Sequence, residues 1–190
     1  MRVLGIVGSV RKNGNTEILI REALDGAKEA GAETEIVLLA GKNIIACDGC
    51  GACRKVGVCP VKDDMQGIYK QMEAADAILL GSPVYFHSFS TQIKAVMDRT
   101  NLFLFDKKLN RKVGAPIVAV GRGGGESTRT QLISFFVIHG MIPLRGVIGF
   151  GFEPGGVRYG EGRSPGSTAL GEAQAAGREV VDMVRLLKNG

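Results

Sequence analysis

The sequence predicts an α/β fold in which helices cover both faces of a parallel sheet. Strand-like and helix-like segments alternate along the chain. The strand-like segments, such as residues 2–8 and 77–81, are short and continuously apolar instead of alternating between apolar and polar residues. A strand that is apolar on both sides must be buried on both sides, and helical crossovers bury it there. The two observations together predict a doubly wound sheet.

The elements follow one another without a linker or an internal repeat. Strands are expected at residues 2–8, 35–39, 77–81, 115–120 and 142–150. Helices are expected at residues 15–31, 65–75, 90–102, 127–140 and about 168–188. Five parallel strands suggest the flavodoxin-like order 2-1-3-4-5, which places a ligand at the carboxyl ends of strands 1 and 3. Between these elements lie a basic, exposed insertion at 107–112 and a glycine-rich loop at 151–167.

Length and composition fit one domain, residues 1–190, in the cytoplasm. No apolar run is long enough to span a membrane, and the start of the chain does not resemble a signal peptide. The net charge of +5 is modest, and the basic residues are spread along the chain. Because helix-turn-helix and aromatic RNA-binding patterns are also missing, we expect neither a nucleic-acid nor a membrane partner. The charge could instead attract an anionic partner, or it could simply be solvated.

All four cysteines lie in one stretch, with the spacing C-x2-C-x2-C-x5-C and Pro60 directly behind it. This stretch belongs to a loop of about residues 41–64, after the second strand. Three closely spaced cysteines with a fourth further on are typical of the way bacterial ferredoxins hold iron–sulfur cubes. Glycines between the cysteines allow backbone N–H groups to turn toward sulfur. The ligands of a [4Fe–4S] cluster would be Cys47, Cys50, Cys53 and Cys59.

Zinc, disulfides and free thiols remain alternatives for the cysteines. Zinc ribbons usually use two C-x2-C pairs that lie well apart in the sequence, whereas here three cysteines follow in quick succession. Disulfides need an oxidising compartment, which nothing in the sequence indicates. The spacing therefore favours a cluster over the other three.

Residues 8–16, between the first strand and the first helix, form a loop rich in hydroxyl and amide side chains. The loop ends at a helix N-terminus, where exposed N–H groups and the helix dipole favour an anion. It matches neither a Walker A loop nor the G-x-G-x-x-G fingerprint. A terminal phosphate monoester fits this loop. The alternative is an ordinary helix start that Asn15 or Thr16 caps.

Two further loops are expected at the same edge of the sheet. In residues 81–88, Tyr85 and Phe86 could flank a planar ring, or they could pack beneath the next helix. In residues 121–128, three consecutive glycines could let the backbone approach a ligand closely, or they could form a plain turn before a capped helix. Taken together, the three loops predict a pocket for a phosphorylated planar ring.

With these motifs the sequence resembles the iron–sulfur flavoproteins, a branch of the NADPH-dependent FMN reductase group within the flavodoxin-like superfamily. The resemblance covers nearly the whole chain, and the cysteine run is its most specific part, since simple FMN reductases of this fold lack it. The motifs that carry it are G-S-x-R-x-x-G-N-T at 8–16, the cysteine run at 47–59, S-P-V-Y-F at 82–86, Gln92-Ile93-Lys94, Asp98-Arg99 and the triple glycine at 123–125.

The resemblance implies an FMN site and a [4Fe–4S] cluster. The FMN phosphate would be held by Ser9, Arg11, Asn15 and Thr16, and Asn13 of the same loop is included among the cofactor-binding residues. The isoalloxazine ring would be lined by Pro83, Val84, Tyr85 and Phe86. The other edge of the ring would be lined by Gly123, Gly124, Gly125 and Glu126. The cluster would be held by the four cysteines.

The resemblance also implies an assembly and marks one departure. Members of the family form dimers and dimers of dimers, so a homodimer or homotetramer is expected, with residues 107–112 as a candidate intersubunit arm. The family often has a small residue or glycine where this chain has His87. That side chain could narrow the approach to the ring, supply a proton, or have no role in catalysis.

The leading hypothesis is an oxidoreductase that passes single electrons from ferredoxin through the cluster to FMN and on to a small-molecule acceptor. The cofactors would supply the redox chemistry, and no protein nucleophile or base is expected. One alternative is an NAD(P)H-dependent FMN or quinone reductase whose cysteine loop is held by zinc or remains as thiols. Another is an electron carrier or redox sensor without a substrate of its own.

Overall fold

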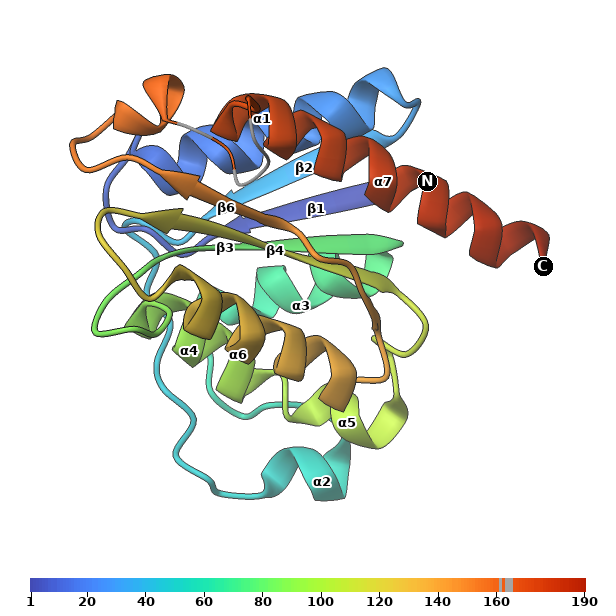
Figure 1. Ribbon diagram of the computed structural model, residues 1–190. Coiled ribbons are helices and arrows are strands. Elements are labelled where there is room, and N and C mark those ends of the chain that lie inside the picture. The colour runs from blue at the N-terminus through green and yellow to red at the C-terminus, as the bar shows by residue number, and fades with distance from the viewer. Residues whose placement is uncertain (161, 163–165) are drawn as a thin grey trace.

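A parallel sheet runs through the middle of the molecule (Figure 1). The computed structural model describes residues 1–160, 162 and 166–190. The strand order is β2-β1-β3-β4-β5, with β6 also beside β4, and every pair is parallel. This confirms the predicted order 2-1-3-4-5. The strands are β1 (Arg2–Val7), β2 (Glu33–Leu38), β3 (Ala77–Pro83), β4 (Val113–Val120), β5 (Ile142–Pro143) and β6 (Val147–Phe150).

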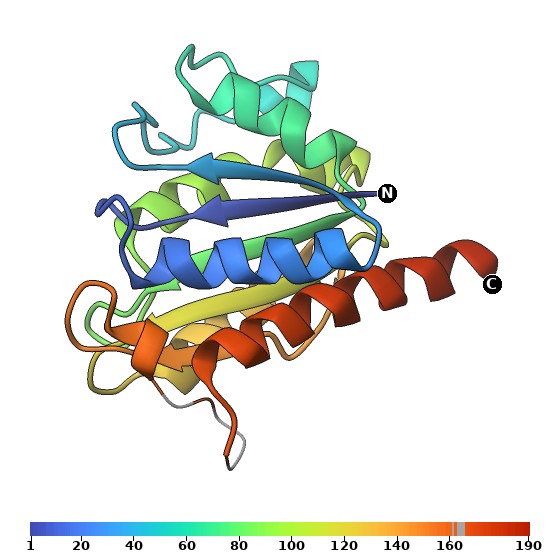
Figure 2. The same ribbon diagram turned by 90° about the horizontal axis from the view of Figure 1, so that it is seen from above.

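Helices cover both faces of the sheet, as predicted. On one face lie α1 (Asn15–Glu29) and α7 (Ala169–Asn189), which run side by side in Figures 1 and 2. The other face carries α3 (Met65–Ala74), α4 (Thr91–Arg99), α5 (Leu102–Asp106) and α6 (Gly125–Ile138). Within the described residues, no helix is both long and apolar enough to cross a membrane.

Three features of the helices and loops differ from the sequence prediction. The helix expected at 90–102 ends at Arg99, and a separate short helix, α5, follows it. The cysteine loop contains one helical turn, α2 (Ala52–Val56), and the glycine-rich loop contains a 3-10 helix, η1 (Gly156–Tyr159). Residues 161 and 163–165 of that glycine-rich loop lie outside the described residues.

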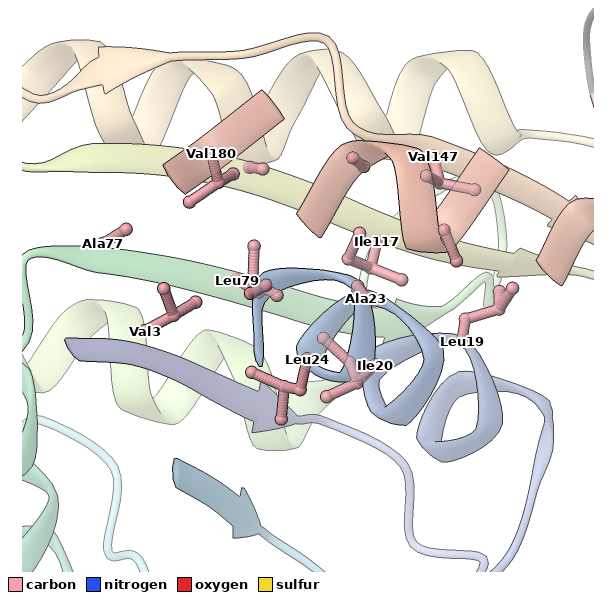
Figure 3. Close-up of a cluster of buried hydrophobic side chains, with 14 of the residues drawn as sticks. Val3, Leu19, Ile20, Ala23, Leu24, Ala77, Leu79, Ile117, Val147 and Val180 are labelled. Atoms are coloured by element: carbon pink, nitrogen blue, oxygen red, sulfur yellow. The ribbon is translucent and has the colours of Figure 1, made fainter. Parts of the chain in front are cut away.

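Two apolar layers hold the sheet between its helices. Successive strand residues point to opposite faces, so Val3 joins the layer beneath α1 and α7, while Leu4 joins the layer facing α3 to α6. Figure 3 shows the first layer, in which Leu79 and Ile117 of the sheet belong to one buried cluster with Ala23 of α1. Strands that are buried on both faces explain the continuous apolar runs of the sequence.

The helices α1 and α7 approach each other closely because small residues line their contact. A Cβ atom on Gly177 would overlap the carbonyl oxygen of Ala23, and one on Gly26 would overlap the carbonyl oxygen of Gln174. In both cases the obstacle is backbone, which cannot turn aside as a flexible side chain can. Glycine at these two positions therefore sets the distance between the helices.

The prediction of one continuous strand at 142–150 is wrong, because the edge strand is broken between β5 and β6. The break lies opposite Pro116 of β4, which has no N–H to donate to a neighbouring strand. Gly146 sits in the break with φ of 65°, and a Cβ there would overlap the carbonyl oxygen of Pro116. The edge strand therefore bends around the proline and resumes at Val147.

The segment 107–112 is a short turn between α5 and β4. Most of it is exposed, as expected, but Leu109 is fully buried. Lys108 Nζ lies 2.7 Å from Glu73 Oε1, and Lys112 Nζ donates to the carbonyl oxygen of Glu73 at 2.9 Å. The turn is thus packed against α3 of its own chain, and its role as an intersubunit arm stays a prediction.

Candidate functional site

The loops that follow the central strands meet at one edge of the sheet. Val7, Gly81 and Ile117 lie in one row across β1, β3 and β4, so the loops after these strands start side by side. Hydrogen bonds then tie the loops together. Gly8 N donates to the carbonyl oxygen of Gly81 at 2.8 Å, and Ser90 Oγ donates to the carbonyl oxygen of Gly8 at 2.6 Å. This is the carboxyl edge, where doubly wound folds bind their ligands.

A cavity of about 170 Å³, here called the edge cavity, opens between these loops. Seven of the thirteen predicted cofactor-binding residues line it: Ser9, Arg11, Asn15, Thr16, Pro83, Val84 and Tyr85. The lining also includes Gly14, Ala119, Gly121, Gly151, Phe152 and Pro154. Two loops that are far apart in the sequence therefore line one cavity, and their role in binding a cofactor stays a prediction.

The first turn of α1 lines the edge cavity, and within the described residues no side chain caps its backbone donors. The N-cap of α1 is Gly14, which has no side chain to accept from the first N–H groups. The alternative, a helix start capped by Asn15 or Thr16, is therefore wrong. Arg11 adds a cation at the cavity wall. The carboxylate of Glu17, the acidic residue of this turn, is paired within the protein, because it accepts from Asn13 N at 2.7 Å and forms an ion pair with Arg21. These features fit a phosphate group.

The side chain of Asn15 holds a neighbouring loop. Its Nδ2 donates to the carbonyl oxygens of Gly151 at 2.7 Å and Glu153 at 3.0 Å, and its Oδ1 accepts from Val157 N at 3.3 Å. The loop after β6 is thereby fixed as a wall of the edge cavity. Sequence reasoning did not place this loop in the site, although it follows a strand at the same edge.

Residues 85–88 form a tight turn at the tip of the second loop. Tyr85 and Ser88 exchange both backbone hydrogen bonds, at 2.9 and 3.0 Å. The two residues between them have positive φ, 48° for Phe86 and 62° for His87, a strained conformation for side chains of this size. The Phe86 side chain is fully exposed beside the edge cavity and does not line it.

The triple glycine lines a second cavity of about 420 Å³, here called the glycine cavity. Gly123, Gly124, Gly125 and Glu126 contribute to it together with His87 and Phe150. Gly124 has φ of 84°, and a Cβ there would come within 2.8 Å of His87 Cα. The glycine therefore lets the third loop pack directly against the second. Gly121 of the same loop lines the edge cavity.

The cysteine loop leaves the sheet after β2 and returns at α3, on the face that carries α4 to α6 (Figure 1). Its two stems pair with each other. Asn43 N donates to Asp64 Oδ2 at 2.7 Å, and Ile45 N donates to Asp63 Oδ2 at 2.8 Å. Three glycines of the loop, Gly49, Gly51 and Gly57, have positive φ, so the backbone turns sharply between the cysteines.

All four cysteines line one cavity of about 70 Å³, here called the cysteine cavity. Cys47 and Cys50 are exposed, while Cys53 and Cys59 are partly buried. Asp48, at the cavity wall, accepts from Cys50 N at 3.1 Å, and hydrogen bonding from Cys50 lowers the pKa of Asp48. Within the described residues, no three His, Cys, Asp or Glu side chains are grouped closely enough to hold a single metal ion. The lining also includes Asp98, Arg99 and Asn101, which sequence reasoning did not assign to this site.

Comparisons with known proteins agree with this architecture. Residues 1–154 match the model of the NADPH-dependent FMN reductase family. An iron-sulfur flavoprotein of Methanocaldococcus jannaschii is 43% identical over 199 residues, covering 99% of this chain and 100% of the relative. An iron-sulfur flavoprotein of Methanosarcina thermophila is 40% identical over 162 residues, covering 84% and 83%. The crystal structure of a flavodoxin, WrbA-like protein from Agrobacterium tumefaciens superposes with a TM-score of 0.69 over 97% of this chain and 98% of the other, at 18% identity.

The match to the NADPH-dependent FMN reductase family, on a flavodoxin-like sheet with a cavity at its carboxyl edge, identifies a flavin-dependent redox protein. The chain belongs to the iron–sulfur flavoproteins within the NADPH-dependent FMN reductase family. It is an FMN-dependent oxidoreductase. The residues of the edge cavity fit FMN, because uncapped N–H groups and Arg11 suit the phosphate.

Proposed function

We propose that this oxidoreductase passes electrons through a [4Fe–4S] cluster to FMN and on to a small-molecule acceptor. One observation carries the proposal: all four cysteines of the chain line a single cavity. Sulfur ligands that surround a volume suit a cube with one thiolate at each iron. When bound, the cluster would supply single electrons, and FMN would supply one- or two-electron chemistry.

The residues of the edge cavity would bind and orient FMN. The first turn of α1 and Arg11 would hold the phosphate, with Ser9 and Thr16 beside them. Pro83, Val84 and Tyr85 would line the ring. Asn15 would contribute by holding the loop of Gly151, because its side-chain hydrogen bonds go to that loop.

The glycine cavity adjoins this site and would receive the other edge of the ring. Gly123 to Gly125 offer backbone without side chains there, and His87 faces the same space. His87 would restrict how an acceptor approaches, since its backbone is fixed in the strained turn and its carbonyl oxygen accepts from Ser127 Oγ at 2.5 Å.

Ferredoxin is the proposed donor. Two of the cysteines are exposed, so a partner protein could come close to the cluster. Arg54 and Lys55 are exposed on α2, between the third and fourth cysteines, and they would attract an acidic partner. The proposed acceptor is a small molecule, because the edge and glycine cavities are of a size for cofactor and substrate and not for a protein.

A second candidate is supported by the family match. The matching family model describes NADPH-dependent FMN reductases, so NAD(P)H could deliver electrons directly to FMN. In that case the cysteine loop would hold zinc or remain as free thiols. Stopped-flow reduction of bound FMN separates the two candidates: rapid reduction by NADPH without ferredoxin supports the second, and reduction by ferredoxin alone supports the first.

The deciding experiment is an anaerobic absorbance spectrum with iron, sulfide and zinc analysis of the same sample. The proposal expects flavin bands over broad cluster absorbance, with about four iron atoms per chain. Flavin with one zinc and no iron would refute the cluster. Two reversible cofactors without turnover toward any acceptor would indicate a carrier or sensor instead of an enzyme.

A further inference from the structure

One buried arginine connects the cysteine loop to the rest of the molecule. Arg99 is the last residue of α4, and only 2% of it is exposed. Its guanidinium forms an ion pair with the buried side chain of Asp63, at 2.7 Å between Nη1 and Oδ2 and 3.2 Å between Nη2 and Oδ1. Burial raises the pKa of Asp63, but hydrogen bonds from Arg99 and from two backbone N–H groups outweigh it and keep the pKa low. The pair is therefore ionised and desolvated.

The same guanidinium binds both stems of the cysteine loop. Nη1 donates to the carbonyl oxygen of Ile45 at 2.7 Å, two residues before Cys47. Nη2 donates to the carbonyl oxygen of Val61 at 3.3 Å, two residues after Cys59. If Arg99 served only as the partner of Asp63 in a buried ion pair, its guanidinium would bind the carboxylate alone. The contacts to both stems use the fork of donors that distinguishes arginine from lysine.

Arg99 also belongs to the wall of the cysteine cavity. Arg99 lines that cavity together with the four cysteines. Four thiolates in one place concentrate negative charge, which nearby cations must offset. Among the residues that line the cavity, Arg99 is the cationic one. The basic residues of the loop itself are exposed and outside this lining: Lys42, Arg54, Lys55 and Lys62.

We propose that Arg99 is the positioning residue of the cysteine site. Its guanidinium holds both stems of the loop by hydrogen bonds and offsets the negative charge of the thiolates. The proposal rests on the cluster of the proposed function. The inference adds that Arg99 holds the two stems of the loop together before metal binds. Arg99 itself belongs to α4 of the flavin-binding domain and not to the loop.

The helix that carries Arg99 also reaches the edge cavity. At the other end of α4, Ser90 caps the helix by accepting from Ile93 N, and it donates to the carbonyl oxygen of Gly8. Nine helical residues span about 13 Å. Helix α4 thus fixes the cysteine loop relative to the loop of the phosphate site. Through this helix, Arg99 would set the position of the cluster relative to FMN.

The test uses the anaerobically prepared holoprotein and its Arg99→Met variant. We expect proteinase K to cleave residues 41–64 of the variant roughly tenfold faster or more, because the stems lose their charge-assisted bonds. Iron and sulfide per chain should fall while FMN per chain stays unchanged. Any remaining cluster should be reduced at a lower midpoint potential, since a nearby positive charge is lost.

Two further variants separate charge from positioning. Arg99→Lys keeps the charge but not the fork, so it should lose protection against cleavage while its midpoint potential stays near that of the wild type. Lys62→Met, the matched control, removes an exposed cation from the same loop and should change neither cleavage nor iron content. If Arg99→Met does not fold because Asp63 is left buried without its partner, Arg99→Met with Asp63→Asn removes that penalty and is measured instead.

The outcomes distinguish this inference from the proposed function. Wild-type protein with flavin but without iron and sulfide would overturn the cluster and the charge offset with it. A cluster in the wild type, together with unchanged cleavage, iron content and potential in Arg99→Met, would overturn the role of Arg99 and leave the proposed function standing. A change in cleavage that Arg99→Lys fully restores would reduce the role to a simple ion pair.

Discussion

The hydroxyl of Thr100 fixes the tautomer of His139. Thr100 Oγ1 donates its proton to the carbonyl oxygen of Met97 at 2.6 Å, so it can only accept from His139 Nε2, which lies 3.0 Å away. Nδ1 of the same ring is buried and has no hydrogen-bond partner within the described residues. Burial lowers the pKa of His139 to about 4. The ring is therefore neutral at physiological pH.

The free energy of unfolding should consequently depend on pH through His139. In the unfolded chain the pKa of a histidine is about 6.5, so the unfolded state binds the proton more tightly. Stability should be constant above about pH 6.5 and fall toward pH 4, by up to about 3 kcal/mol. Urea unfolding at pH 7 and 4.5 checks this, because His139→Phe should lose most of the drop. His87→Gln, at an exposed histidine, is the control, and an equal drop in His139→Phe and the wild type would contradict the prediction.

Replacement of Asn15 by alanine should weaken FMN binding through the loop of Gly151. With three hydrogen bonds to that loop lost, we expect affinity to fall roughly tenfold. Fluorescence titration with FMN and with riboflavin tests the mechanism. Both ligands should weaken by a similar factor if Asn15 holds the loop, whereas a loss confined to FMN would show direct contact with the phosphate. Asn189→Ala, at an exposed position in α7, should leave both affinities unchanged.

Replacement of Gly177 by alanine should destabilise the fold by about 2–4 kcal/mol, because the new methyl group meets backbone of α1. Gly67→Ala provides a control of opposite sign. Gly67 is exposed in α3 with open space around it, so alanine there should stabilise the protein by about 0.5–1 kcal/mol. Denaturant unfolding measures both. Two variants of equal stability would show that α1 and α7 can move apart.

Removal of one proposed cluster ligand should separate the two cofactors. In Cys50→Ala we expect iron and sulfide to be lost while FMN per chain is retained, because the cysteine and edge cavities share no lining residue. Metal analysis and the flavin spectrum of the purified variant are the measurements. Loss of FMN in a variant that still shows the native far-UV spectrum would mean that the two sites depend on each other.

The sequence was sufficient to predict the sheet order, because the strands are apolar on both faces and the helices between them are regular. It failed at the edge strand, where residues 142–150 looked continuous. The cause lies in another strand: Pro116 withdraws a hydrogen bond that the neighbouring strand would need. A proline in a central strand is a readable signal, but its effect falls on a segment far along the chain.

The lining of the edge cavity was predictable where a motif follows a strand closely, as with Ser9 after β1 and Val84 after β3. The role of a residue was not predictable where a tertiary contact assigns it. Asn15 looked like a phosphate ligand, yet its side chain holds another loop. Arg99 looked like one basic residue of a helix, and only its burial between the two stems connects it to the cysteines.

Hydrogen bonds between Asn43 and Asp64 join the two ends of the cysteine loop, so the loop is a self-contained insertion in the fold. Its ends already meet on the scaffold, and the chain between them adds no strand to the sheet. Closing such an insert costs little more for a long segment than for a short one. A gene for a simple flavin reductase could therefore gain or lose the proposed cluster site by a single insertion or deletion at this point. The same junction offers protein engineers a place to graft other metal-binding loops onto a flavin enzyme.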